Sequence, residues 1–185
     1  MNPRNNHPEK DLKRSVTEGI VYVLLLVCVM FVVPRYVVQR TIIDGSSMEN
    51  TFQDGDQLLV EKVTRYFTEF ERFDIVVFQP DERGEGDQFI KRIIGLPGET
   101  VQIVEGQIFV NGELLPESFG KMPIVNAGIA AEPITLGEDE YFVLGDNREI
   151  SLDSRYESVG AVHHSQMEGR VILQIYPFSA FGTVE

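Results

Sequence analysis

The sequence predicts a mainly β protein, in which coiled antiparallel sheets or a partial barrel follow one N-terminal transmembrane helix. Two observations lead to this expectation. One uninterrupted apolar run lies near the N-terminus, from Ile20 to Val33. Beyond Arg40, short apolar or alternating segments are separated by Gly, Pro, Asn and Asp, and no long amphipathic helical pattern occurs. We therefore expect a membrane segment first and a β-domain after it.

Composition limits the class of protein. The 185 residues are 43% hydrophobic, which suits one domain of ordinary size with a real core. The net charge of -13 argues against a nucleic-acid partner. This charge is unevenly divided: residues 1–40 hold six basic and three acidic side chains, a balance of +3, so residues 41–185 carry -16.

The apolar run has three possible interpretations. Its fourteen residues are fewer than the roughly 20 that a straight membrane-spanning helix needs. A cleavable signal peptide needs a small-x-small site directly after the run, and residues 34–38 offer none. A buried core helix would show a polar face, and this run has none. We therefore predict a membrane anchor over residues 16–38, with Arg35 reaching the far interface and membrane lipid as a partner.

Basic side chains before the anchor set its expected orientation. The basic residues before the run are Arg4, Lys10, Lys13 and Arg14. Under the positive-inside rule they keep residues 1–15 in the cytoplasm, which places residues 39–185 outside it. Cys28 is the single cysteine and lies inside the apolar run, so the outer domain has no disulfide. An anchor residue is the expected role of Cys28, with lipidation as the alternative.

Strands are expected throughout the outer domain. The apolar or alternating segments cover residues 57–61, 74–78, 88–94, 100–104, 107–110, 141–144 and 170–176. Glu105-Gly106 and Asn111-Gly112 are hairpin-type turn signals on either side of one of them. Residues from about 98 to 138 contain many of the Gly, Pro and Glu residues that interrupt the apolar segments, so we expect them to form a small inserted subdomain.

Two residues have the chemistry of a nucleophile and its base. A serine hydroxyl such as that of Ser47 needs a base, and a neutral lysine can supply one if burial lowers its pKa. Lys91 shares a strand face with Phe89 and Ile93, which is an unusual place for a lysine. The alternatives remain open: Lys91 can be an edge-strand lysine that discourages aggregation, and Ser47 can be a turn residue.

A polar loop follows the apolar segment 141–144. Residues Gly145 to Arg155 hold seven charged or hydroxyl side chains. Loops carried by a rigid strand are where functional residues concentrate, although a solvated turn has the same composition.

Taken together, these segments resemble the motifs of bacterial type I signal peptidases, which are membrane-anchored Ser–Lys endopeptidases. Four motifs occur in order over most of the chain. They are Ser47-Met48-Glu49-Asn50-Thr51, Arg72 to Phe78, the Lys-Arg-x-x-Gly-x-Pro-Gly motif over Lys91 to Gly98, and Gly-Asp-Asn-x-x-x-Ser-x-Asp-Ser-Arg over Gly145 to Arg155.

The resemblance implies a role for each matching residue. Ser47 would be the nucleophile, with its own backbone N–H in the oxyanion hole, and Lys91 would be the general base. Supporting roles fall to Ser151, which would orient the lysine, to the ion pair of Asp153 and Arg155, and to Asp146, which would brace the loop.

The implied substrates are the signal peptides of exported preproteins, with small residues at the first and third positions before the cut. Our candidates for the shallow apolar pockets are Ile43, Met48 and Ile90, and plain core packing is the alternative role for these three.

Three positions depart from the family pattern. Asn50 replaces the usual proline, which removes a fixed φ and is expected to loosen the turn beside Ser47. Phe73 replaces a glycine, so we expect that turn to avoid positive φ. Gly45 stands where some members carry a hydroxyl for the oxyanion hole, which leaves fewer donors there.

Rival functions share part of this pattern. Another Ser–Lys peptidase, such as a self-cleaving regulator, would have the dyad without the anchor. A membrane-tethered binding module without catalysis would have the anchor and the β-domain, and an inactive family member would have all of it. No cofactor or metal is expected, because His163 and His164 are adjacent on a strand and no third ligand is spaced to join them.

Overall fold

The computed structural model describes residues 8–80, 86–120 and 122–184. The chain divides into two compact units, Met1–Val38 and Gln39–Glu185. The predicted cytoplasmic segment 1–15 lies partly outside the described residues, because the description begins at residue 8.

The described part of the first unit, from residue 8 on, is helical almost throughout. Helix α1 (Pro8–Val27) continues through a π-helical turn, Cys28–Val32, into the short helix α2 (Val33–Tyr36). Pro34 stands near the start of α2, where its missing N–H is tolerated. The stretch Lys13–Val32 has a mean hydropathy of 2.3 and is long and apolar enough to cross a membrane. Its large apolar side chains are exposed within the unit, as lipid-facing side chains are.

The second unit is built on a large antiparallel sheet. Among the described residues, its eight strands follow the order β1-β2-β11-β3-β4-β9-β10, with β12 paired to β11. The strands are β1 (Val38–Ile42), β2 (Gln57–Glu61), β3 (Ile75–Phe78), β4 (Phe89–Gly95), β9 (Glu140–Leu144), β10 (Val162–His163), β11 (Met167–Tyr176) and β12 (Gly182–Thr183). The mainly β fold class, with its N-terminal apolar helix, is confirmed.

Strand β3 lies at the centre of this sheet and is buried on both faces. Ile75 and Val77 belong to one hydrophobic cluster, while Val76 and Phe78 belong to another. A strand that is covered on both sides needs apolar residues at every position, which explains the unbroken apolar sequence. Its neighbour β4 is held in register with it, and Lys91 of β4 lies opposite Val76.

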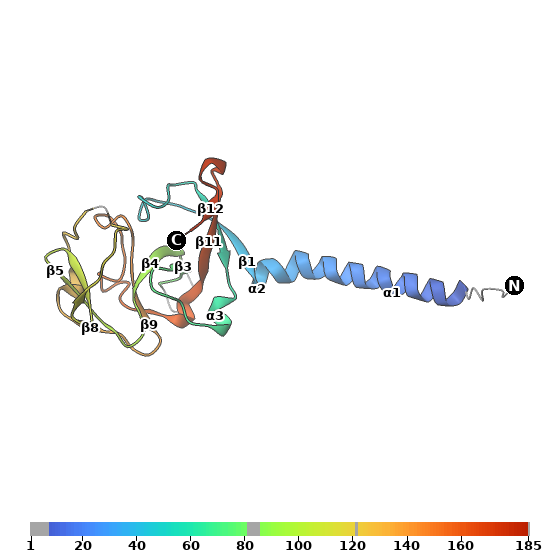
Figure 1. The fold of residues 1–185 in the computed structure, drawn as a ribbon, viewed down its shortest axis with the longest axis horizontal. Coiled ribbons are helices and arrows are strands. Elements are labelled where there is room, and N and C mark those ends of the chain that lie inside the picture. Colours follow the sequence, from blue (N-terminus) through green and yellow to red (C-terminus); the bar gives the residue numbers. More distant parts are fainter. Residues whose placement is uncertain (1–7, 81–85, 121, 185) are drawn as a thin grey trace. The chain divides into compact units, whose positions relative to one another are not determined.

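A second, smaller sheet is formed by the residues between β4 and β9. Among the described residues, its strand order is β7-β6-β5-β8, and all four strands lie within the predicted insertion 98–138. They are β5 (Thr100–Val104), β6 (Gln107–Val110), β7 (Glu113–Leu114) and β8 (Ile134–Thr135). Figure 1 shows β5 and β8 well away from β11. A third cluster joins the two sheets, because it contains Ile94 and Phe142 of the large sheet as well as Val101 and Ile108 of the small one.

Both predicted hairpin turns are present in this small sheet. Glu105 and Gly106 have φ values of 50° and 78°, and Asn111 and Gly112 have values of 53° and 81°. Two consecutive residues with positive φ are typical of a type I′ turn, whose twist matches that of the flanking strands.

Short helical segments complete the domain. They are α3 (Thr64–Phe67) and three 3-10 turns, Gly128–Ala131, His164–Gln166 and Phe178–Ala180. The His164 ring packs against the rings of Phe70 and Tyr141, and its Nε2 lies 3.1 Å from the Arg65 carbonyl oxygen. This histidine therefore has a packing role.

The expectation for Phe73 is wrong. Phe73 has a φ of 74°, in the left-handed region that the sequence analysis excluded. It is the third residue of a turn closed by the Asp74 N–H, which donates to the Glu71 carbonyl at 3.1 Å. The Phe73 N–H donates to the Ile93 carbonyl at 2.9 Å, and its ring lies 5.1 Å from that of Phe119. These contacts offset the backbone strain, which costs about 1 kcal/mol.

Gly169 provides a test of how closely β11 and β2 approach each other. A Cβ added at Gly169 would lie 2.1 Å from the Glu61 backbone oxygen, which cannot swing aside as a side chain can. We expect Gly169→Ala to lower the free energy of unfolding by about 1–3 kcal/mol. Thermal unfolding of the detergent-solubilised protein measures this loss.

Gly182 of β12 supplies the matched control. No atom lies within 4 Å of the position that its Cβ would take, so Gly182→Ala should leave the unfolding temperature nearly unchanged. Equal unfolding temperatures for the two variants would contradict the predicted close approach at Gly169.

Candidate active site

Ser47 lies in the segment that joins β1 to β2, and buried side chains hold this segment in place. Met48 and Phe52 are buried in the core cluster that also contains Ile43. The Met48 carbonyl accepts hydrogen bonds from the N–H groups of Thr51 and Phe52, at 3.0 and 2.9 Å, which folds the segment into a tight turn. Ser47 therefore has a fixed position in the fold.

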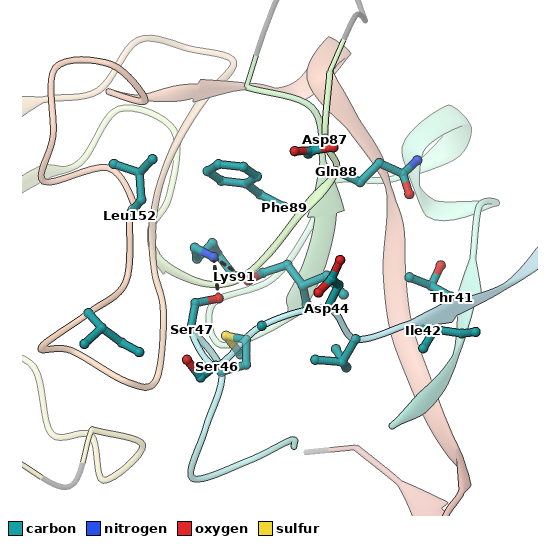
Figure 2. Close-up of a pocket in the computed structure, with 15 residues that line it drawn as sticks. Thr41, Ile42, Asp44, Ser46, Ser47, Asp87, Gln88, Phe89, Lys91 and Leu152 are labelled. Carbon is teal, nitrogen blue, oxygen red and sulfur yellow. Dashed lines mark hydrogen bonds between the residues drawn. The ribbon is translucent and has the colours of Figure 1, made fainter. Parts of the chain in front are cut away.

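Lys91 lies on β4 and reaches the serine. Its Nζ lies 2.8 Å from Ser47 Oγ and donates a second hydrogen bond to the Ile90 carbonyl at 3.0 Å. The residue is 3% exposed, and the centre of the Phe89 ring lies 5.0 Å from Nζ. The structure thus brings together the predicted nucleophile and base, and Figure 2 shows their hydrogen bond.

Burial changes the acidity of this lysine. Desolvation lowers the pKa of Lys91 from 10.5 to about 8, because the charged ammonium loses its hydration. The carboxylates of Asp153 and Asp146 act in the opposite direction and raise it, but less strongly. A substantial fraction of Lys91 is therefore neutral, and able to accept a proton, slightly above neutral pH.

Asp146 joins the loop after β9 to the two catalytic candidates. Its carboxylate accepts from Arg92 Nε at 3.0 Å and from Arg92 Nη2 at 2.9 Å, and both side chains are fully buried. It also bonds to the hydroxyl of Thr51. Since Arg92 follows Lys91 and Thr51 follows the Ser47 turn, Asp146 links three separate segments of the chain.

Asp153 and Arg155 form the predicted ion pair. Arg155 donates from Nε to Asp153 Oδ1 at 2.8 Å and from Nη2 to Asp153 Oδ2 at 2.9 Å. The Gly145 N–H also donates to this carboxylate, at 3.1 Å. Asp153 therefore joins Gly145, the first residue of the loop, to Arg155, its last.

The predicted contact between Ser151 and Lys91 is not formed. Within the described residues, the buried Ser151 Oγ has no hydrogen-bond partner. The backbone explains this position, because the Ser151 N–H donates to the Asn147 carbonyl at 3.1 Å and the Ser151 carbonyl accepts from Arg155. The hydroxyl instead lies against Gly145, where an added Cβ would come within 2.2 Å of it.

Asn50 takes a backbone conformation and a contact that the sequence did not indicate. Its φ is 102°, a value that the proline of the family motif cannot adopt. Its side chain donates from Nδ2 to the Asp146 carbonyl at 3.2 Å. The asparagine therefore attaches the Ser47 turn to the loop after β9.

Backbone groups near Ser47 complete the geometry. The Asn147 N–H donates to the Ser47 carbonyl at 3.0 Å, and the Gly45 N–H donates to Asp54 Oδ1 at 2.8 Å. Among the described residues, the Ser47 N–H donates to no protein group, which leaves it free for an oxyanion. Because the Gly45 N–H already donates to Asp54, it is not available to the oxyanion.

The dyad opens into a cleft of about 470 Å³. All three predicted pocket residues, Ile43, Met48 and Ile90, line it together with Ser47 and Lys91. The cleft has further lining residues that the sequence analysis did not identify, namely Thr41, Ile42, Asp44, Gly45, Ser46, Asp87, Gln88, Phe89, Ile150 and Leu152.

Arg92 and Asn147 are functional candidates that the sequence analysis missed. Both lie inside the motifs that carry the resemblance, directly after Lys91 and Asp146. Their position in those motifs could have identified them, but their partners come from distant segments. Within the described parts of the chain, no group of His, Cys, Asp and Glu side chains is arranged to hold a metal.

Comparison with known proteins identifies a family. The signal peptidase family, described as peptidase S26, matches residues 16–176. Signal peptidase I of Bacillus licheniformis is 31% identical over 174 residues, covering 90% of this chain and 92% of its own. Probable signal peptidase I-2 of a Synechocystis strain is 38% identical over 151 residues, covering 80% of this chain and 67% of its own.

One solved structure is also similar. A signal peptidase I from Enterococcus faecalis V583 matches with 36% sequence identity and a TM-score of 0.45, covering 56% of this chain and 97% of that chain. The family match over residues 16–176, with relatives that align over most of their own length, shows that this chain belongs to the signal peptidase family, peptidase S26.

Proposed function

We propose that this protein is a membrane-anchored serine endopeptidase that removes N-terminal signal peptides from exported preproteins, with Ser47 as nucleophile and Lys91 as general base. The observation that carries the proposal is the distance of 2.8 Å between Ser47 Oγ and the nitrogen of a buried lysine. Membership of the signal peptidase family supports the class of substrate.

The chemistry follows from the geometry. Neutral Lys91 takes the Ser47 proton as Oγ attacks the scissile carbonyl, and the ammonium then gives this proton to the leaving amine as the C–N bond breaks and the acyl-enzyme forms. The neutral Lys91 next takes a proton from the water that attacks the acyl-enzyme, and it returns this proton to Ser47 Oγ as the ester bond breaks. The free Ser47 N–H supports the oxyanion that develops in both steps.

Strand β4 offers the substrate a place to bind in an extended conformation. Residues Phe89 to Lys91 pair with β3 along one edge, whereas pairing with β9 along the other edge begins only at Arg92. Among the described residues, the edge beside the cleft therefore has no strand partner. An extended peptide can add there by main-chain hydrogen bonds, which require no particular side chain.

The pocket residues support a preference for small side chains before the cut. Met48 and Ile43 are almost fully buried and Ile90 is partly buried, so the part of the cleft that these three residues line is apolar and closely packed. A large side chain there would displace core residues, whereas Ala or Gly would fit without movement.

The anchor supports the location. The apolar helix suits a single membrane span, and the basic residues Lys10, Lys13 and Arg14 favour a cytoplasmic N-terminus. Residues 39–185 would then lie outside the cytoplasm, on the side of the membrane to which exported preproteins are delivered.

Substitution of the two dyad residues tests the proposed catalysis. We expect Ser47→Ala and Lys91→Ala each to reduce cleavage of a preprotein with an Ala-x-Ala site by at least about 10³-fold, because each removes one reacting group. Mass spectrometry of the products should place the wild-type cut after the second Ala.

Ser179→Ala and Lys62→Ala are the controls for these variants. Neither residue lines the cleft, so both variants should cut at the wild-type rate. If the dyad variants keep their activity, the assigned nucleophile and base are wrong. If the wild type cuts nothing in detergent or in lipid, a binding module or an inactive family member becomes the better conclusion.

The pKa of Lys91 sets the expected pH dependence. Only the neutral amine acts as a base, so activity should rise as pH increases through the lowered pKa of about 8 and level off above it. Below that value kcat/KM should fall about tenfold for each pH unit. A rate independent of pH from 6 to 10, measured on a peptide without titrating groups, would exclude Lys91 as the base.

A further inference from the structure

Two large apolar side chains are exposed in the loop after β9. Ile150 and Leu152 are 58% and 43% exposed, whereas Ser151 between them is 1% exposed. The alternation turns the serine inward and both aliphatic side chains outward. Exposed apolar side chains gathered at one place on a soluble domain often mark a binding surface.

This exposure does not come from a loosely held loop. The Val143 N–H donates to Ser154 Oγ at 3.0 Å, and the Asp153–Arg155 ion pair lies directly after Leu152. On the other side, the Ser151 N–H donates to the Asn147 carbonyl. Buried polar contacts thus fix the backbone on both sides, so Ile150 and Leu152 are held outward in a defined position.

Both side chains line the cleft that contains the dyad. Figure 2 shows Leu152 on one side of Ser47 and Lys91, while Thr41, Ile42 and Asp44 lie on the other. Ile43, one of the three proposed pocket residues, lies between Ile42 and Asp44 in the chain. The cleft therefore has two walls, and the dyad lies between them.

A substrate must extend past both walls. If its residues before the cut occupy the side of Ile43, the chain leaves Ser47 Oγ toward Leu152. Since Ile150 and Leu152 line the same cleft as Ser47, the residues that directly follow the cut are the ones placed to meet this second wall.

We propose that Ile150 and Leu152 are specificity-determining residues that contact the first two residues after the cut and favour an apolar side chain there. This inference rests on the proposed function, because it assumes that Ser47 cuts a peptide bound in this cleft. The contact is between aliphatic side chains on a half-open surface, so the preference is modest.

Peptides that share one small-x-small site and differ only after the cut provide the test. One series carries Leu, Ala, Ser or Lys at the first position after the cut, and a second series carries them at the second position. For the full-length protein in detergent, we expect kcat/KM to be about fivefold higher with Leu than with Ser at one of these positions, less than a closed pocket gives. The double variant Ile150→Ala, Leu152→Ala should bring this ratio close to one.

Leu114→Ala is the matched control. Leu114 is also an exposed aliphatic residue, but it lies on β7 and does not line the cleft. Its variant should keep the wild-type ratio of Leu to Ser. In Leu152→Glu, the new carboxylate should favour Lys after the cut, which a role for Leu152 in folding alone would not produce.

The outcomes separate this inference from the proposed function. If the wild type cuts after the small-x-small site at the same rate whatever follows it, or if the double variant keeps the preference, the inference is wrong and the proposed function stands. If the double variant loses cleavage activity equally on all peptides, and only in liposomes, then this surface contacts lipid and the inference is overturned. If no peptide is cut, both proposals fail together.

Discussion

The burial of Lys91 beside Ser47 is the constraint on which the rest of the site depends. A lysine can act as a base only if desolvation outweighs every nearby negative charge, and two carboxylates, Asp146 and Asp153, are close enough to raise its pKa. Each of these carboxylates is bound by two nitrogens of an arginine, Arg92 or Arg155. Within the described part of the chain, Lys91 itself donates only to Ser47 Oγ and the Ile90 carbonyl. The carboxylates are thus directed into structural ion pairs, and the lysine keeps a low pKa among them.

Two arginines of this loop, Arg155 and Arg148, connect it to the insertion that carries the small sheet. Arg155 Nη1 donates to the Asn126 carbonyl at 3.1 Å, and the Arg155 carbonyl accepts from the Ile129 N–H at 2.9 Å. Arg148 forms a two-nitrogen pair with Glu117, at 2.9 and 3.0 Å. The residues inserted between β4 and β9 therefore brace the loop that faces the dyad. Among the described residues the insertion lines no part of the cleft, so its contact with the dyad runs through this loop.

Local pattern was enough to predict most of the fold. The strands at residues 57–61, 100–104 and 107–110 have the predicted bounds, because apolar alternation and turn residues act over a few neighbours. The φ of Phe73 and the position of the Ser151 hydroxyl could not be predicted in this way. Phe73 is held by Ile93 and Phe119, and Ser151 by Asn147 and Arg155, and these contacts exist only after folding. Lys91 drew attention because its strand face is apolar, whereas the contact between Arg92 and Asp146 could not be predicted, since the two residues lie 54 positions apart.

The two walls of the cleft differ in how they are held. The wall with Ile43 is part of the core, because Ile43 and Met48 pack with Val60 and Val171 of the large sheet. The wall with Ile150 and Leu152 is a loop, fixed by buried charges that lie beneath it. A substitution of Ile43 or Met48 changes the core volume and costs stability, whereas a substitution at Ile150 or Leu152 changes an exposed surface and costs little. Ile150 and Leu152 are therefore positions where the lining of the cleft can change without loss of the fold.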